Sequence, residues 1–313
     1  MPEKEIYDLI IIGGGPGGLS AGIYAMRAAL KTVLIEKGIP GGQMVMTDTV
    51  DNYPGIKSIS GAELSTKMAQ HAQSYGLEII SREVASIDIN GDIFSIKLSN
   101  DEQLDAESVI LAAGGSPRKV GIPGEDEGYG KGVSYCAVCD GFFFRGKTVA
   151  VVGGGDSAVE EAHYLSKLAK KTYIIHRRDE LRAEKILQQR VFAEDSIEVL
   201  WNKIPIEIKA DEGGVFAMDL EDTQTGEVSE LATEGVFIFI GFEPNNNLVP
   251  ADVNMNSGGY VITNEKCETN VPGFFVVGDL RDKFARQIVV SASEGCIAAL
   301  SAAWFVENKR ACV

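Results

Sequence analysis

One pattern occurs twice in this sequence and limits what the chain can fold into. Residues 9–24 read LIIIGGGPGGLSAGIY, and residues 149–164 read VAVVGGGDSAVEEAHY. Each copy has an apolar run typical of a buried strand, a glycine-rich turn and a stretch of small residues typical of a helix. The first glycines of the copies, Gly13 and Gly153, lie 153 − 13 = 140 residues apart. Because 313 residues suffice for about two domains, the repeat predicts an α/β protein that uses one nucleotide-binding fold twice.

The first copy meets the physical requirements of a dinucleotide site. Gly13, Gly15 and Gly18 form the spacing GxGxxG between a predicted strand at 8–12 and a predicted helix that begins near Pro16. The first glycine permits a tight turn, the second lets a pyrophosphate approach the backbone, and the third lets helix and strand pack closely. The helix N-terminus then offers free N–H groups to the phosphates.

Glu36 strengthens this interpretation. It ends the second predicted strand, at 32–36, and follows the first glycine by 36 − 13 = 23 residues. At this place an acidic side chain accepts hydrogen bonds from the hydroxyls of a ribose.

The second copy differs at the matching position. Gly153 and Gly155 are followed by Ala158, which the fingerprint permits in third place. The same distance, 176 − 153 = 23, leads to the cluster His176, Arg177 and Arg178. A carboxylate repels a 2′-phosphate, whereas arginine binds it with charge-assisted hydrogen bonds. We therefore expect FAD or NAD at the first site and NADP(H) at the second; a solvated basic turn is the alternative.

A cysteine pair precedes the second copy. Cys136 and Cys139 are separated by two residues and followed by Asp140, a spacing that suits a redox disulfide or half of a zinc site. Zinc would need two further ligands, and the remaining cysteines and the histidines are isolated: Cys267, Cys296, Cys312, His71, His163 and His176. We favour the redox pair. Asp140 can pass a proton to a leaving thiolate, or alternatively cap the turn before Gly141.

The composition excludes several classes of partner. The 29 Lys and Arg against 45 Asp and Glu give a net charge of −16, so we expect neither nucleic acid nor an anionic membrane as a partner. The N-terminal residues do not resemble a signal peptide, and no apolar stretch reaches the roughly 18 residues that cross a membrane. Five cysteines are too few for a disulfide framework, and a reducing, cytoplasmic compartment is expected.

Strand-like and helix-like runs alternate along the rest of the chain. After Arg178 we expect a helix to about Phe192, and a final helix at 286–307. The expected strands lie at 93–99, 107–114, 197–209, 215–221 and 235–241, with a strand–turn–strand segment at 259–279. No low-complexity linker marks a boundary, and the inserted domain is placed at about 117–244.

Taken in order, these residues resemble the low-molecular-weight, bacterial-type thioredoxin reductases of the pyridine nucleotide-disulfide oxidoreductase family. The match spans essentially the whole chain. It includes the first glycine fingerprint with Glu36, the Gly-Gly-Gln at 41–43, CxxCDG ahead of the second nucleotide fold, GGGDSAVEEA, the HRR cluster with Arg182 close behind, PGFFVVGD and the RQ pair at 286–287. Two departures remove no reactive group: Ala-Ala-Gly-Gly at 112–115, and an Ala-Val spacer between the cysteines.

The resemblance implies a fold and an activity. The fold is α/β with two Rossmann-like, three-layer domains: an FAD domain of residues 1–116 and 245–313, and an NADPH domain of residues 117–244 inserted into it. Electrons would pass from NADPH through FAD to the Cys136–Cys139 disulfide and then to a thioredoxin-like protein, with rotation of the NADPH domain between half-reactions. A homodimer is also implied.

The resemblance also implies site residues. The FAD residues are Gly13, Gly15, Pro16, Gly18, Glu36, Gly41, Gln43, Asn52, Gly114, Asp279, Arg286 and Gln287. The NADPH residues are Gly153, Gly155, Asp156, Ser157, Ala158, His176, Arg177, Arg178 and Arg182. Cys139 would face the flavin and Cys136 would attack the partner's disulfide, with Asp140 as the third catalytic residue and no metal.

Three other functions remain open at this point. One is a related reductase whose electron donor is ferredoxin or another reduced carrier, which the HRR cluster disfavours. Another is a thiol oxidase of similar architecture that passes electrons to oxygen. The third is a non-enzymatic redox sensor that signals through the CxxC pair.

Overall fold

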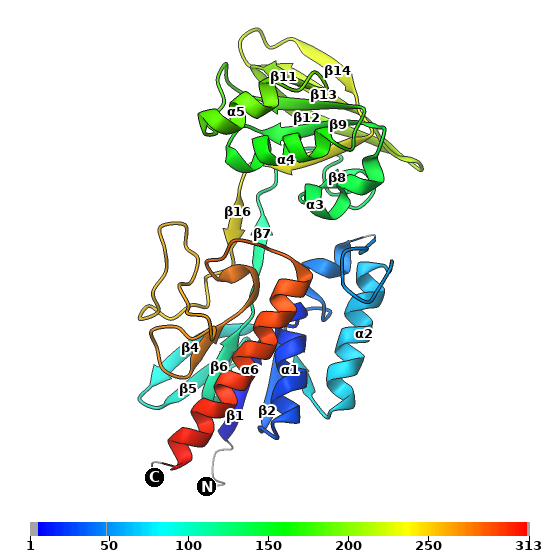
Figure 1. The fold of residues 1–313 in the computed structure, drawn as a ribbon. Helices are drawn as coiled ribbons and strands as arrows, with labels where there is room; N and C mark the ends of the chain where they lie inside the picture. The colour runs from blue at the N-terminus through cyan, green and yellow to red at the C-terminus, as the bar shows by residue number, and fades with distance from the viewer. Residues whose placement is uncertain (1–5, 48, 312–313) are drawn as a thin grey trace. The chain divides into compact units, whose positions relative to one another are not determined.

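The computed structural model describes residues 6–47 and 49–311, and the chain in it divides into two compact units (Figure 1). Unit 1 ends at Ser116 and resumes at Glu243, and unit 2 is Pro117–Phe242. The chain passes between the units twice, and the two crossings form a small two-stranded sheet of β7 (Gly115–Pro117) and β16 (Phe242–Pro244). The second crossing therefore lies at 242/243, against 244/245 expected from the sequence.

Unit 1 is built on a mixed sheet in the order β3-β2-β1-β6-β5-β4, and β17 pairs with β6. The strands β1, β2, β3, β6 and β17 run parallel to their partners, whereas β4, β5 and the start of β6 form an antiparallel meander. The bounds are β1 Ile6–Ile12, β2 Thr32–Glu36, β3 Glu78–Ser81, β4 Val84–Asn90, β5 Ile93–Leu98, β6 Gln103–Leu111 and β17 Phe274–Val276.

Two hydrophobic cores lie on the two faces of this sheet. On one face α1 (Pro16–Arg27), α2 (Gly61–Ser74) and α6 (Ile288–Ala311) pack around Leu19, Ala72 and Ala299 (Figure 1). On the other face the meander and the segment around Val261 enclose a second core that contains Phe94. Alternate residues of β1 point into each core, because side chains alternate across a strand.

Unit 2 has the same three-layer plan. Its parallel sheet runs in the order β11-β10-β9-β15-β8, with α4 and α5 on one face and an antiparallel sheet β12-β13-β14 on the other. The strand bounds are β8 Val133–Ser134, β9 Thr148–Gly153, β10 Lys171–His176, β11 Ile197–Trp201, β12 Lys203–Asp211, β13 Gly214–Asp222, β14 Val228–Ala232 and β15 Gly235–Phe239. The helices are α3 Ala137–Asp140, α4 Asp156–Ser166 and α5 Lys185–Phe192. Together the two units confirm the predicted fold class.

Several local predictions were wrong. The helix expected after Arg178 begins only at Lys185, because the amides of Arg182 and Ala183 donate to the carbonyl of Gly154. The expected strand at 197–209 is broken at Asn202, which has a positive φ of 55°. Strand β14 was missed, and only Phe274–Val276 of the expected strands at 259–279 forms a regular strand.

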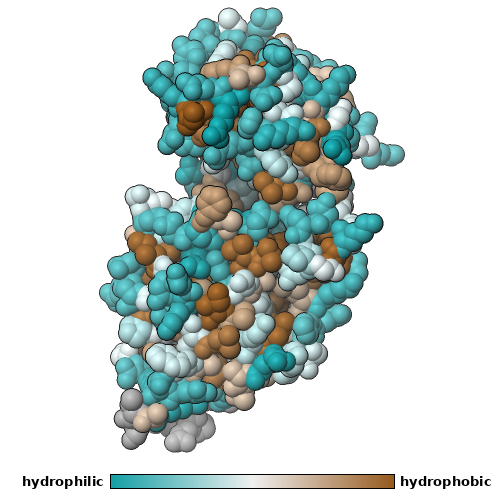
Figure 2. All heavy atoms as spheres, viewed as in Figure 1, coloured by the Kyte–Doolittle hydropathy of each residue, from teal (hydrophilic) through white to brown (hydrophobic). Residues whose placement is uncertain are grey.

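The expectation that no apolar stretch is long enough to cross a membrane was wrong by length and composition, because helix α6 meets both criteria. Five of its buried residues, however, belong to the core that α1 also lines: Ala298, Ala299, Ala302, Ala303 and Val306. The small residues permit this close packing, since a Cβ on Gly295 would collide with the carbonyl oxygen of Gly17. We interpret α6 as the core helix of unit 1. Figure 2 shows hydrophilic side chains over much of the visible face, with hydrophobic ones over α6.

Candidate functional site

The first glycine turn has the geometry that a phosphate site requires. Gly13 has a positive φ of 104°, and a Cβ on Gly18 would collide with the carbonyl oxygen of Gly13. Gly15 is the N-cap of α1 and has extended backbone angles, with Pro16 at the first helical position. Among the described residues no atom lies within 4 Å of a Cβ built on Gly15. The helix N-terminus thus faces open space that a pyrophosphate would fit.

Glu36 is held at the edge of this turn. Its two carboxylate oxygens accept from the backbone N–H groups of Gly14, at 2.6 Å, and Gly38, at 2.8 Å. A carboxylate has about four acceptor positions, so two remain for ribose hydroxyls. The N–H of Gly41 donates to Gly14 at 2.7 Å, and a Cβ on Gly42 would lie 3.2 Å from Gly15 Cα. The loop at 41–42 therefore closes the cradle.

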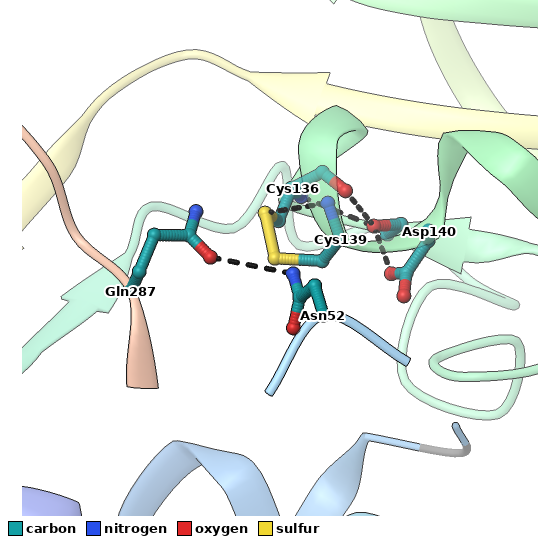
Figure 3. Close-up of a disulfide and its surroundings, with 6 residues drawn as sticks. Asn52, Cys136, Cys139, Asp140 and Gln287 are labelled. Carbon is teal, nitrogen blue, oxygen red and sulfur yellow. Dashed lines mark hydrogen bonds between the residues drawn. A yellow bond between two sulfur atoms is a disulfide. The ribbon is translucent and has the colours of Figure 1, made fainter. Parts of the chain in front are cut away.

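The other predicted FAD residues lie on loops of unit 1. Asn52 donates to Gln287 at 3.4 Å, which joins two segments 235 positions apart (Figure 3). Asp279 lies in the short helix η3 (Gly278–Leu280), and the Arg286 guanidinium lies 4.6 Å from the centre of the Tyr260 ring. Gln43 is exposed on η1 (Gly42–Met46), and Gly114 has a positive φ of 67° at the first crossing.

The second glycine turn repeats the first in unit 2. Gly153 has a positive φ of 152°, and Gly155 is the N-cap of α4 with extended angles. Asp156 and Ser157 are exposed in the first turn of α4, and Ala158 is buried beneath it. The Asp156 carboxylate accepts from the Glu184 N–H at 2.8 Å. This contact keeps the segment that carries Arg182 beside the turn.

The basic cluster separates into a buried and an exposed part. His176 is 5% exposed, and its Nδ1 lies 3.2 Å from the carbonyl oxygen of Gly153. Burial lowers the pKa of His176, so the ring is neutral near pH 7. Arg177, Arg178 and Arg182 are exposed, and Arg182 reaches to 3.8 Å from a Cβ built on Gly155. The three arginines can therefore bind a phosphate, while His176 supports the glycine turn.

Cys136 and Cys139 form a disulfide (Figure 3). Cys136 is the N-cap of α3, and its Sγ accepts from the Cys139 N–H at 3.2 Å. The hydroxyl of Ser134 donates to the Asp140 carboxylate at 2.5 Å and accepts from the Cys136 N–H at 3.0 Å. Among the described residues no group of three or more His, Cys, Asp or Glu side chains could hold a metal ion.

Four residues around the disulfide were not predicted. Ser134 is buried, and its only signal in the sequence is a hydroxyl two residues before the first cysteine. Val138, Phe142 and Phe143 are 47%, 56% and 40% exposed. The run GFFF after Asp140 could have been noticed, but an apolar run normally predicts burial.

Two other cysteines are described. Cys267 is fully buried, and burial raises its pKa to about 11, so its thiol is unreactive at neutral pH. Cys296 is a half-buried free thiol on α6. Cys312, for which the sequence suggested no role, lies outside the described residues.

Comparison with known proteins identifies a matching family model and close relatives over nearly the whole chain. The family model described as pyridine nucleotide-disulphide oxidoreductase matches residues 7–295. A thioredoxin reductase of Bacillus subtilis is 49% identical over 308 residues, which cover 98% of this chain and 97% of the relative.

Solved structures agree with this result. The thioredoxin reductase of Streptococcus pyogenes MGAS5005 has a TM-score of 0.93 at 43% identity, covering 97% of this chain and 99% of that one. A Lactococcus lactis thioredoxin reductase, described as being in an FR conformation, has a TM-score of 0.66 at 44% identity, covering 96% and 99%.

The buried, neutral His176 makes stability depend on pH. Its folded pKa lies below the unfolded value, so the unfolded chain binds more protons as the pH falls through about 6.5. The free energy of unfolding should therefore decrease between pH 7.5 and pH 5.5. In a His176→Gln variant this decrease should be smaller, as measured by urea denaturation at both pH values. A His163→Gln variant serves as the control, and equal pH slopes for wild type and His176→Gln would contradict the assignment.

Proposed function

This chain belongs to the pyridine nucleotide-disulphide oxidoreductase family, and we propose that it is an NADPH-dependent thioredoxin-disulfide reductase of a reducing, cytoplasmic compartment. The reaction is NADPH + H⁺ + thioredoxin disulfide → NADP⁺ + thioredoxin dithiol. The observation that carries this proposal is a disulfide in the same unit as a glycine turn flanked by exposed arginines. A dithiol for exchange and a site for NADPH are thus built into one domain.

We assign FAD to the domain of residues 1–116 and 245–313 and NADPH to the domain of residues 117–244. The cradle of Gly13–Gly18, Glu36 and Gly41 fits an adenosine diphosphate without a 2′-phosphate, because Glu36 would repel that group. In unit 2 the arginine forks favour the 2′-phosphate of NADPH. When bound, FAD accepts a hydride and supplies an electron pair to the disulfide.

Once reduced, Cys136 is the thiolate that attacks the disulfide of thioredoxin. The Cys139 N–H, which donates to Cys136 Sγ, stabilises the charged form of that sulfur. The attack forms a mixed disulfide between Cys136 and the partner and releases one partner thiolate. Cys139 then attacks Cys136, which restores the intramolecular disulfide and releases the second partner thiolate.

We propose that Asp140 moves a proton in this exchange. Ser134 ties the Asp140 carboxylate to the N-terminus of the cysteine loop, because its hydroxyl contacts both the carboxylate and the Cys136 N–H. A carboxyl group held beside the pair can protonate a leaving thiolate and take the proton back in the reverse direction.

A protein substrate is supported by the surface beside the disulfide. Val138, Phe142 and Phe143 expose apolar side chains within four residues of Cys139. Exposed aromatic side chains are typical of the centre of a protein–protein interface. They suit a folded partner such as thioredoxin better than a small disulfide.

The cysteine pair and the nicotinamide site belong to the same domain, so we propose that this domain rotates to present each of them to the flavin. The crossings near 115–119 and 242–248 would act as the hinge. Two relatives of nearly equal identity have TM-scores of 0.93 and 0.66, which supports more than one conformation in the family. An engineered disulfide between the domains that left turnover unchanged would contradict rotation.

We also propose a homodimer. On α6 the large apolar side chains Val289, Ile297, Leu300 and Trp304 are at least 36% exposed and recur at helical spacing. A second copy of this chain would bury this face. Sedimentation equilibrium should give twice the chain mass of 33.6 kDa.

Three alternatives predict different behaviour. A ferredoxin-dependent reductase would not need the exposed arginines and would not be reduced by NADPH. A thiol oxidase would consume oxygen with dithiols. A redox sensor would show negligible turnover with any thioredoxin. Stopped-flow reduction of the bound flavin by NADPH and by NADH separates the first of these from the proposed function.

Replacing either cysteine should stop thioredoxin reduction but in different ways. Cys136→Ser and Cys139→Ser should each lower NADPH-dependent turnover by roughly a thousandfold or more, since each removes one sulfur of the exchange. Only Cys139→Ser retains the attacking thiol, so it should accumulate a mixed disulfide with oxidised thioredoxin on a non-reducing gel. Turnover of Cys136→Ser at the wild-type rate would refute the scheme.

The exposed arginines should determine the choice of nucleotide. Arg177→Ala and Arg178→Ala should each raise the KM for NADPH roughly ten- to a hundredfold, the cost of losing a charged hydrogen bond, and leave the KM for NADH unchanged. Arg190→Ala, which removes an exposed arginine from α5, is the matched control. Equal losses with both nucleotides would contradict the assignment of the 2′-phosphate site.

A further inference from the structure

Glu294 is the only charged residue between Gln287 and Glu307. It lies on α6, which is otherwise apolar or small over this stretch, and it is only 5% exposed. A buried carboxylate is costly unless its charge is compensated by partners. The contacts of the Glu294 carboxylate therefore indicate which part of the fold it stabilises.

Three groups of one segment converge on the Glu294 carboxylate. Its Oε2 accepts from the Gly278 N–H at 2.7 Å and from Lys283 Nζ at 3.2 Å. Its Oε1 lies 3.1 Å from the Arg281 guanidinium. One side chain of α6 thus holds three positions of the loop that leads into that helix.

Lys283 extends this contact to Asp279. The side chain of Lys283 is 7% exposed, and its ammonium lies 3.2 Å from an oxygen of Asp279 and 3.5 Å from the Ser291 hydroxyl. Asp279 and Glu294 carry two negative charges, and Arg281 and Lys283 carry two positive charges. The cluster is neutral as a whole, which permits its burial.

The segment held by this cluster carries three of the residues that we assign to FAD: Asp279, Arg286 and Gln287. We propose that Glu294 and Lys283 are positioning residues that hold the 278–287 segment, and Asp279 in particular, in the conformation that retains FAD. This inference rests on the proposed function. Neither side chain is assigned to contact the cofactor. Glu294 binds the start of the segment to α6, and Lys283 links the Glu294 carboxylate to Asp279.

The fold of unit 1 does not depend on Glu294 alone. Arg281 also donates to the Asn264 carbonyl at 3.2 Å and to Cys267 Sγ at 3.5 Å, so this residue ties the segment to the rest of unit 1. Loss of Glu294 would still leave Arg281 these two partners. We therefore expect unit 1 to stay folded while the segment becomes looser.

The test uses the full-length protein and three variants. Glu294→Gln keeps the shape of the side chain but removes the charge, and Lys283→Met removes the ammonium while Glu294 keeps Arg281 and Gly278. Glu307→Gln makes the same chemical change at an exposed position of α6 and is the control. The dissociation constant of FAD is measured by its fluorescence on release, and folding by circular dichroism. Hydrogen exchange of the peptide 277–287 reports the segment directly.

We expect Glu294→Gln and Lys283→Met to weaken FAD binding by about tenfold or more, the order found for outer hydrogen-bond partners of metal ligands. Exchange in 277–287 should become faster in Glu294→Gln, and Glu307→Gln should match wild type in both measurements. If Glu294→Gln does not fold, Lys283→Met decides. Folded variants that bind FAD as tightly as wild type would overturn this inference alone. A wild-type chain that binds no FAD would overturn the proposed function with it.

Discussion

The close approach of backbone to backbone at Gly13 and Gly18 is the constraint on which unit 1 depends. Because Gly18 has no Cβ, α1 can begin directly above the end of β1, with its N-terminal N–H groups directed past Gly15. Unit 2 has the same strand, turn and helix, but Ala158 stands at the position of Gly18 and carries a Cβ, so between Gly153 and Ala158 only Gly153 must lack one. The position of the helix N-terminus then determines where Glu36 in one unit and the arginines in the other can meet a nucleotide.

The features that follow from local geometry could be predicted from the sequence. The glycine turns, the strands that flank them and the fold class were identified because their residue types are required by backbone angles and close contacts. The segment at 179–184 was misjudged as helix, since its hydrogen bonds go to Gly154, 28 residues away from Arg182. Ser134 and Lys283 were missed for the same reason. Their roles depend on partners that only the tertiary fold brings near.

Burial determines what an ionisable side chain does, and the sequence alone does not show which ionisable side chains are buried. His176 occupies the position equivalent to Glu36 and was grouped with the arginines, but it is enclosed against Gly154 and stays neutral. Glu294 differs from His176, because it is a single carboxylate in an apolar helix. Such a buried carboxylate predicts that cationic partners lie close to it. Among the described residues, the roles of His176 and Glu294 follow from the groups packed around them and not from their spacing along the chain.

The insertion of unit 2 determines the order in which the two units can complete their folding. All of Pro117–Phe242 is contiguous, so it can fold as soon as it leaves the ribosome. Unit 1 cannot finish at that stage, because β17 and α6, which pack against β6 and α1, are translated after unit 2. Until β17 and α6 are made, the segment that ends at Ser116 must therefore keep apolar side chains of β6 and α1 uncovered.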